Sequence, residues 1–134
     1  MYKPVLADEA IKAVQSGDRI LMHSVALTPH HLIDALVKRA EELRGVEIVH
    51  LHTEGELPYL KPEYKDSFEL HSFFVGGNAR KATQEGRAYY IPVFLNETQR
   101  LIRDRIVPVD VAFIQVSPPG KHGFVSLGSS VDTT

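Results

Sequence analysis

The sequence contains no cysteine among its 134 residues, and this absence excludes several kinds of chemistry. No disulfide framework, thiolate nucleophile or cysteine-ligated zinc or iron–sulfur centre can be built from it. A reducing compartment suits such a chain, and we expect the cytoplasm. The chain also has no apolar run near the ~20 residues that span a bilayer. We therefore expect no membrane partner. The first residues also lack the basic and apolar regions of a signal peptide, so no signal peptide is expected.

The sequence also lacks an excess of charge of either sign. The formal net charge is −2, and no block of lysine and arginine stands out. A nucleic-acid partner is therefore not expected, because it would normally require a basic face. The contents of 43% hydrophobic and 24% charged residues are ordinary for one globular domain. A small anion remains a possible ligand, since it needs only local groups.

Apolar periodicity divides the chain into alternating helices and strands. Thr28 is expected to cap the second helix, with Pro29 at its first position, and Asn96 to cap the last helix. The alternation predicts an α/β fold with a mostly parallel sheet flanked by helices. The expected helices span residues 6–14, 28–44, 78–85 and 96–106, and the expected strands span 19–24, 46–52, 68–75, 89–94 and 109–117.

The segments that leave the strands are the expected place for function. Ligands of open α/β sheets gather at the carboxyl ends of the strands. A small hairpin is also conceivable after the last strand. The strand exits are 25–28, 52–61, 75–78, 94–97 and 117–122, and the second is long enough to be functional or mobile.

A double glycine precedes the third helix in the segment FFVGGNARKATQEG, residues 73–86. Its backbone N–H groups could face an anion or a carbonyl oxygen. Alternatively, Gly76 and Gly77 form a tight turn that requires positive φ, which is the simpler interpretation. The segment matches neither the dinucleotide-binding fingerprint nor the P-loop.

Seven histidines suggest a metal site, but their pattern does not support one. His50 and His52 are two residues apart, and His71 belongs to another strand, yet no third fixed ligand follows from the spacing. Histidines bonded to nearby backbone are the simpler interpretation, and we expect no metal. Glu54 is better explained as a solvated loop acid, because a lone carboxylate needs a tuned environment to act as a nucleophile or base.

Three long stretches resemble, in order, the amino-terminal part of the acetyl-CoA hydrolase/transferase family. They are GDRILMHSVALTPHHLIDALVKRAEELRGVEIVHLHTEG, FFVGGNARKATQEGRAYYIPVFLNE and PVDVAFIQVSPPGKHGFVSLGSSVD. The resemblance runs from about Lys3 to the last residue. It implies a CoA-transferase-like (NagB/RpiA-like) first domain, because proteins of this family consist of two similar α/β domains. The family includes 4-hydroxybutyrate, acetate and butyrate CoA-transferases.

In this family a glutamate attacks the thioester carbonyl of an acyl-CoA, and CoA then passes through a glutamyl-CoA thioester to a second carboxylic acid. That glutamate belongs to the second domain, so the resemblance implies no catalytic residue in this chain. Residues 1–134 are expected to be a fragment that is inactive alone. Coenzyme A is expected as a substrate, with no tightly bound cofactor. The expected partners are an acyl-CoA, a carboxylic acid, the carboxy-terminal domain and further copies in a homo-oligomer.

The resemblance carries over only to the strand-exit turns. The turn at residues 25–29 would occupy the place of the family's loop over the acyl end, where its backbone N–H groups could face the thioester carbonyl as an oxyanion hole does. Residues 52–55, 75–78 and 117–123 would border the same cleft. A hydrolase of CoA esters and a non-catalytic α/β module that binds a carboxylate or anion are the alternatives, and in each turn glycine and proline could simply shape the backbone. The candidate substrate-binding residues are Val25, Ala26, Thr28, Glu54, Gly55, Gly76, Gly77 and Asn78.

Overall fold

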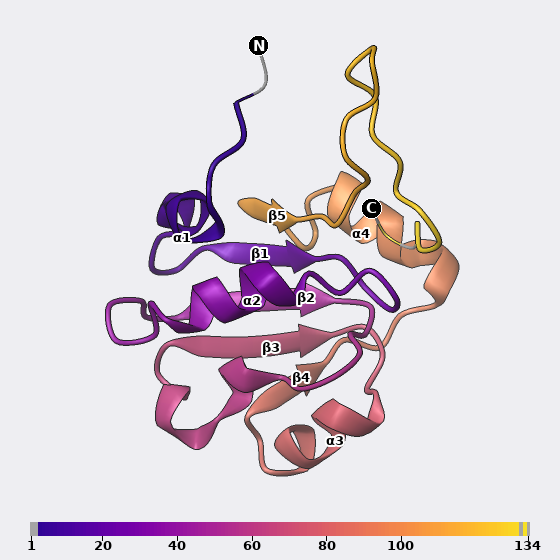
Figure 1. The fold of residues 1–134 in the computed structure, drawn as a ribbon. Coiled ribbons are helices and arrows are strands. Elements are labelled where there is room, and N and C mark those ends of the chain that lie inside the picture. Colours follow the sequence, from indigo (N-terminus) through magenta and orange to yellow (C-terminus); the bar gives the residue numbers. More distant parts are fainter. Residues whose placement is uncertain (1–2, 132, 134) are drawn as a thin grey trace.

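The computed structural model describes residues 3–131 and 133, which form a five-stranded sheet flanked by helices (Figure 1). The strand order is β4-β3-β2-β1-β5, and every neighbouring pair is parallel, as the alternation of elements predicts. The strands are β1 (Arg19–Met22), β2 (Val46–His50), β3 (Phe68–Ser72), β4 (Ala88–Tyr90) and β5 (Val111–Phe113). The α-helices are α1 (Ala7–Ala10), α2 (His30–Val37), α3 (Gly77–Gln84) and α4 (Thr98–Arg103), and the 3₁₀ turns are η1 (Ile11–Ala13), η2 (Pro58–Leu60), η3 (Pro62–Tyr64) and η4 (Leu95–Glu97).

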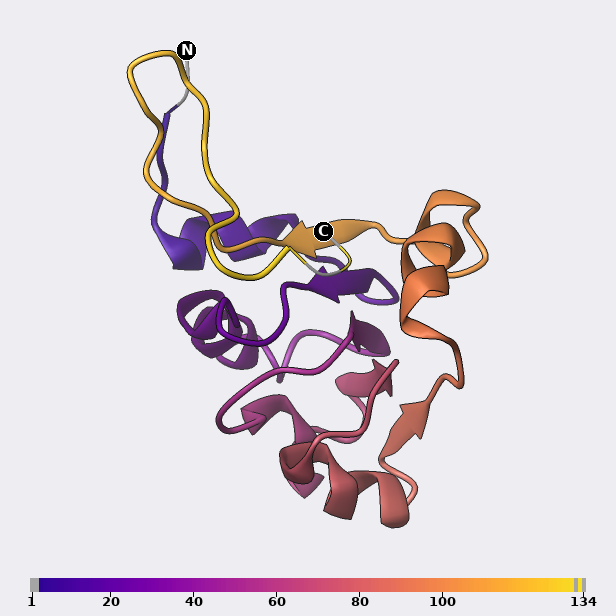
Figure 2. The same ribbon diagram turned by 90° about the vertical axis from the view of Figure 1, so that its right-hand side faces the viewer.

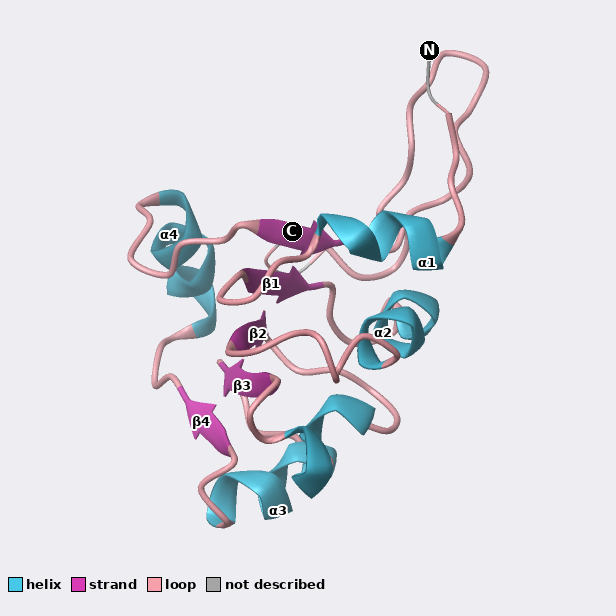
Figure 3. Ribbon diagram, turned by 90° about the vertical axis from the view of Figure 1, so that its left-hand side faces the viewer, coloured by secondary structure: helices cyan, strands magenta, loops and turns pink. Residues whose placement is uncertain are grey.

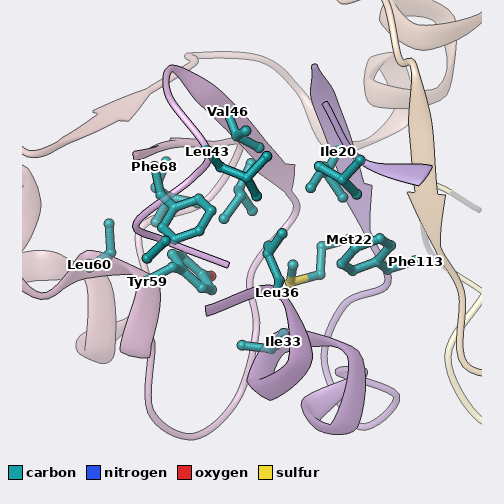
Figure 4. Packing of buried hydrophobic residues seen from close by; sticks show 14 of the residues in the cluster. Ile20, Met22, Ile33, Leu36, Leu43, Val46, Tyr59, Leu60, Phe68 and Phe113 are labelled. Atoms are coloured by element: carbon teal, nitrogen blue, oxygen red, sulfur yellow. The ribbon is translucent and has the colours of Figure 1, made fainter. Parts of the chain in front are cut away.

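The main core lies on one face of the sheet, under α1, α2 and α3 (Figures 1 and 3). Alternate residues of each strand point to this face, as the two-residue period of a strand requires. Ile20 and Ile48 of neighbouring strands meet Ile33 and Leu36 of α2, and all four are fully buried. Tyr59 of η2 fills the same layer (Figure 4). This layer fixes the strands in register and so positions their carboxyl ends.

The opposite face is covered mainly by α4, which packs on a smaller core around Val49, Phe73 and Val107 (Figure 3). The half of this face near the amino ends of the strands is polar, with an ion pair between Arg19 and Glu47. The half near the carboxyl ends is apolar. Two halves of one sheet face therefore differ in character, and the apolar half lies at the edge where ligands bind in α/β folds.

The strand order reverses between β1 and β5. Strands β1 to β4 extend the sheet in one direction, and the chain then crosses over to place β5 on the other side of β1. Such a switch point leaves a crevice at the carboxyl ends of the two strands. None of the helices among the residues that the structure describes is long and apolar enough to cross a membrane.

Both predicted helix caps are wrong. Helix α2 begins at His30 with Pro29 as its N-cap, and the Thr28 hydroxyl instead bonds to neighbouring turns. Helix α4 begins at Thr98, and Asn96 lies in the preceding 3₁₀ turn. In both places a local capping preference is outweighed by how the turn is attached to the rest of the fold.

The last strand is shorter than predicted, and the long segment after β2 is more firmly held. The strand predicted over 109–117 is paired only from Val111 to Phe113, because the N–H of Gln115 donates to the ring Nδ1 of His23 at 3.1 Å instead of to a strand. The long segment after β2 is anchored rather than loose, since Tyr59 within it is completely buried. The small hairpin after β5 is confirmed by a hydrogen bond from the N–H of Ser117 to the carbonyl of Ser126 at 2.9 Å.

Candidate functional site

The exits of β1 and β2 are joined through the hydroxyl of Thr28. This hydroxyl donates to the carbonyl of Val25 at 2.7 Å and accepts from the N–H of Glu54 at 3.1 Å. The N–H of Val25 in turn donates to the carbonyl of His52 at 2.9 Å. The two turns are therefore held together through backbone groups, which gives a geometry that depends little on exposed side chains.

Asn78 ties the start of α3 to the same turns. Its side-chain Nδ2 donates to the carbonyls of Thr53 at 2.7 Å and Gly55 at 2.9 Å. Both partners are acceptors, so only the amide nitrogen can face them. The structure thus brings Val25, Thr28, Glu54, Gly55 and Asn78 into one hydrogen-bonded set, which we call the strand-exit network.

The double glycine does not need positive φ, so that interpretation is wrong. Gly76 has φ −66°, and Gly77 begins α3 with ordinary backbone geometry. A Cβ on Gly76 would lie 3.0 Å from Oδ1 of Asn78, whereas a Cβ on Gly77 would meet open space. Gly76 is therefore needed for the close approach of Asn78. Gly55 does have a left-handed backbone, with φ +84°, and a Cβ there would lie 3.0 Å from Cε1 of His30.

Val25 has φ +56°, which is rare for a β-branched residue and costs on the order of 1–3 kcal/mol. Such strain persists only where surrounding contacts impose it, and it clusters at functional sites. In this turn the N–H groups of Val25, Leu27 and Thr28 all have acceptors within the chain. Among the described residues of this turn, only the N–H of Ala26, which is an exposed residue, has no acceptor. Within this turn, the N–H of Ala26 is therefore the group that could face a ligand oxygen without first losing an internal hydrogen bond.

The start of α3 supplies two more free donors. Neither Gly77 nor Asn78 has an acceptor for its backbone N–H among the described residues. These groups lie at the positive end of the helix dipole, where they favour an anion or a carbonyl oxygen. Glu54 and His52 add one titratable pair nearby, with Oε1 and Nε2 3.4 Å apart and the Glu54 side chain 65% exposed. The exposure of Glu54 agrees with a solvated acid.

Sequence reasoning missed His23, which is fully buried at the crevice between β1 and β5. Its Nε2 lies 2.7 Å from the carbonyl of Ser130, and its Nδ1 accepts from the N–H of Gln115. The Ser130 hydroxyl also donates to the carbonyl of Ser24 at 3.2 Å. Because Nδ1 accepts a hydrogen bond, it carries no hydrogen, and the hydrogen of the neutral ring is on Nε2. Nε2 therefore donates to the carbonyl of Ser130. No sequence signal brings residues more than a hundred positions apart together.

The predicted border at 117–123 is not part of the strand-exit network. These residues form a hairpin loop that projects away from the sheet (Figures 1 and 2). The chain returns to the exit of β1 only at Gly128, where a Cβ would lie 3.4 Å from Leu27. The residues that close this side of the site are thus Gly128 and Ser130.

Burial keeps two polar side chains under the site uncharged. Burial, with a smaller contribution from His52, lowers the pKa of His50 to about 3, and neither ring nitrogen has a hydrogen-bond partner. Burial also raises the pKa of Tyr59, partly opposed by the nearby Thr53 hydroxyl, although no well-formed hydrogen bond joins the two. His50 is therefore neutral, and it is not bonded to backbone as the sequence suggested.

The histidines of β2 and β3 do not converge on one point. Val49 pairs with His71 and His50 with Ser72, so His50 and His71 point to opposite faces of the sheet. The part of the chain that the structure describes contains no group of three ligating side chains that could hold an ion.

The chain is similar to known CoA-transferases. The sequence profile of the acetyl-CoA hydrolase/transferase N-terminal domain matches residues 2–134. A succinyl-CoA:acetate/propanoyl-CoA:succinate CoA transferase of Fasciola hepatica is 44% identical over 129 residues, covering 95% of this chain and 27% of that protein. The 4-hydroxybutyrate coenzyme A transferase of Clostridium kluyveri is 39% identical over 132 residues, covering 98% of this chain and 31% of that protein.

Solved structures agree with these sequence relationships. RipA from Yersinia pestis matches with a TM-score of 0.79 at 25% identity, covering 92% of this chain and 31% of that one. A 4-hydroxybutyrate CoA-transferase from Porphyromonas gingivalis matches with a TM-score of 0.72 at 25% identity, covering 97% of this chain and 29% of that one. The chain spans less than a third of the length of these curated relatives. By the match over almost its whole length, the chain belongs to the acetyl-CoA hydrolase/transferase family and corresponds to that family's N-terminal domain.

Proposed function

We propose that residues 1–134 form one wall of the active site of a CoA-transferase that moves CoA between an acyl-CoA and a short-chain carboxylic acid. The observation that carries this proposal is the strand-exit network, which lies at the carboxyl ends of β1 and β2 in a chain of this family. Acetyl-CoA as donor, and butyrate or 4-hydroxybutyrate as acceptor, are the substrates we propose. The relatives of this chain include a 4-hydroxybutyrate coenzyme A transferase and a butyryl-CoA:acetate CoA-transferase.

The nucleophile of the proposed reaction is a glutamate in polypeptide outside these residues. Its carboxylate attacks the thioester carbonyl, the thiolate of CoA leaves, and an acyl-glutamyl anhydride forms. The thiolate then attacks the glutamyl carbonyl, releases the first acid and gives the glutamyl-CoA thioester, which the second acid resolves. Glu54 is exposed and belongs to the turn rather than to the reacting centre, so we assign it no nucleophilic role.

The role that we propose for this chain is to present backbone donors. Negative charge develops on the thioester oxygen when the carboxylate attacks, and a fixed N–H lowers the energy of that state. The N–H groups of Ala26, Gly77 and Asn78 are free for this purpose among the described residues. The strain at Val25 and the amide of Asn78 would fix these donors in place before substrate binds.

The test uses the full-length protein with acetyl-CoA and butyrate. The proposal expects butyryl-CoA to form, and expects borohydride to inactivate the protein only after an acyl-CoA has been added. Release of free CoA without an acceptor acid would instead indicate a hydrolase, because water can resolve the same glutamyl thioester. Binding of carboxylate with no change in any acyl-CoA would indicate a non-catalytic module and would contradict the proposal.

A further inference from the structure

A cavity of about 370 Å³ lies beside the strand-exit network, on the face of the sheet that α4 covers. It sits over the carboxyl ends of three adjacent parallel strands, because its walls come from the last residue of β4, from the residues that follow β2, β3 and β4, and from the first residue of α4. The side chains that line it are those of Leu51, His52, Phe73, Phe74, Tyr90, Val93, Phe94, Leu95 and Thr98.

His52 connects this cavity to the strand-exit network. Its backbone carbonyl accepts the N–H of the strained Val25, and its ring packs edge-on against Phe74 with centroids 5.5 Å apart. The same imidazole lies 3.4 Å from the Glu54 carboxylate. A molecule whose polar end faces Val25 and Glu54 would therefore direct its other end past His52 into the cavity.

The lining of the cavity selects an apolar ligand without charge. Most of its surface is aromatic or aliphatic, and His52 is the only titratable ring apart from the Tyr90 phenol. The Thr98 hydroxyl already donates to the carbonyl of Leu95 at 2.7 Å. A larger neighbouring cavity differs, since Glu97 and Arg100 line it. A chain rich in amides, such as the pantetheine arm of CoA, would leave polar groups unpaired in the smaller cavity, which is costly.

We propose that this cavity binds the hydrocarbon tail of the acyl group and so determines the preferred chain length. The inference rests on the proposed function, because it assigns the cavity to the substrate of that reaction. Phe73 is buried at the cavity, whereas Phe74 and Phe94 at its rim are 57% and 76% exposed. A tail of two to five carbons would replace water against these rings. Each methylene buried there is expected to improve binding about fourfold.

The test fills the cavity in the full-length protein with Val93→Phe. Val93 is half-buried and lines both this cavity and the larger neighbouring one, so the larger ring reduces the space there without displacing the main core. The ratio of kcat/KM for butyryl-CoA to that for acetyl-CoA is expected to fall about 15-fold, since two methylenes lose their site. Phe74→Ala, which removes an exposed wall, is expected to lower the same ratio with little effect on folding. Ile106→Phe is the matched control, because Ile106 lines only the neighbouring cavity.

A direct binding measurement separates this inference from the proposed function. Calorimetric titration with hexanoate and acetate should show tighter binding of hexanoate, and Val93→Phe should remove that preference, whether or not any acyl-CoA reacts. Absence of all turnover by the wild-type protein would contradict the proposed function alone. An unchanged chain-length ratio in both cavity variants would overturn the inference. So would an equal loss for all chain lengths, which is the result expected if polypeptide outside these residues fills the cavity.

Discussion

The side-chain amide of Asn78, in the first turn of α3, donates a hydrogen bond at 2.9 Å to the carbonyl of Gly55, which lies beyond the end of β2. It donates a second to the carbonyl of Thr53 at 2.7 Å. One side chain therefore joins the exits of two neighbouring strands. The close approach of its Oδ1 to Gly76 explains why a glycine precedes this helix.

Asn78→Asp should weaken both the fold and the reaction. A carboxylate in this place cannot donate to the two carbonyls and would face their oxygens, so the free energy of unfolding should fall by about 1–3 kcal/mol. The kcat/KM of the full-length protein should fall as the turn loosens. Gln84→Glu is the control, because it adds the same charge at an exposed position of the same helix. Urea unfolding and the CoA-transfer assay measure the two effects, and equal behaviour of the two variants would disprove the role given to Asn78.

Gly55 and Gly77 should respond in opposite ways to alanine. Gly55→Ala forces a left-handed backbone on alanine and brings Cβ to 3.0 Å from His30, so a loss of about 1–2 kcal/mol in unfolding free energy is expected. Gly77→Ala meets open space in ordinary helical geometry and should gain about 0.4–1 kcal/mol. Equilibrium denaturation of both variants tests the pair. A stabilising Gly55→Ala would show that the turn adopts another conformation.

His50 should make the fold sensitive to acid. Its pKa is about 3 in the folded protein and about 6.5 when unfolded, so the unfolded chain binds the proton more readily. The stabilising contribution is complete above pH 6.5 and is lost as the pH falls from 6.5 toward 3. His50→Leu should therefore reduce the slope of stability against pH in this window. At pH 7 the variant should be nearly as stable as the wild type, because neither ring nitrogen has a partner to lose.

Urea titrations of both proteins at several pH values between 4 and 7 measure this slope. Comparing the two removes the contribution of the other titratable groups, which the substitution leaves in place. Identical slopes for His50→Leu and the wild type would mean that the ring is accessible to protons in the folded state.

Residues 1–134 expressed alone should self-associate through the apolar surface around α4. Phe94, Leu95 and Ile106 are 76%, 65% and 65% exposed, and Tyr90 adds to the same area. Exposed apolar areas of this kind usually meet another surface. Sedimentation velocity should show a mass that rises with concentration, and Phe94→Glu should reduce the effect. Lys12→Glu, far from α4 on the surface of η1, should not. A monomer at all concentrations would disprove the expectation.

The sequence alone determined the order and type of the main elements. The spacing of apolar residues in 19–24, 46–52 and 68–75 marks buried strands, and the intervening periodicity marks helices, because each pattern depends on residues close together in the chain. This alternation predicts a parallel sheet, and the resemblance of the same segments predicts the family. The strand exits as the place of the candidate site also follow from the alternation alone.

The tertiary structure decided which of those turns meet and which groups remain free. The sequence around Thr28 predicts a helix cap. In the fold its hydroxyl instead accepts the N–H of Glu54, because β1 and β2 pair in register. The N–H groups of the turn after β1 were expected to face a substrate oxygen. Those of Val25, Leu27 and Thr28 instead donate to carbonyls of the chain, and that of Ala26 does not. His23 meets Ser130 only because β5 crosses to the far side of β1. These contacts depend on strand order and register, which are set by long-range packing that no local pattern of residues encodes.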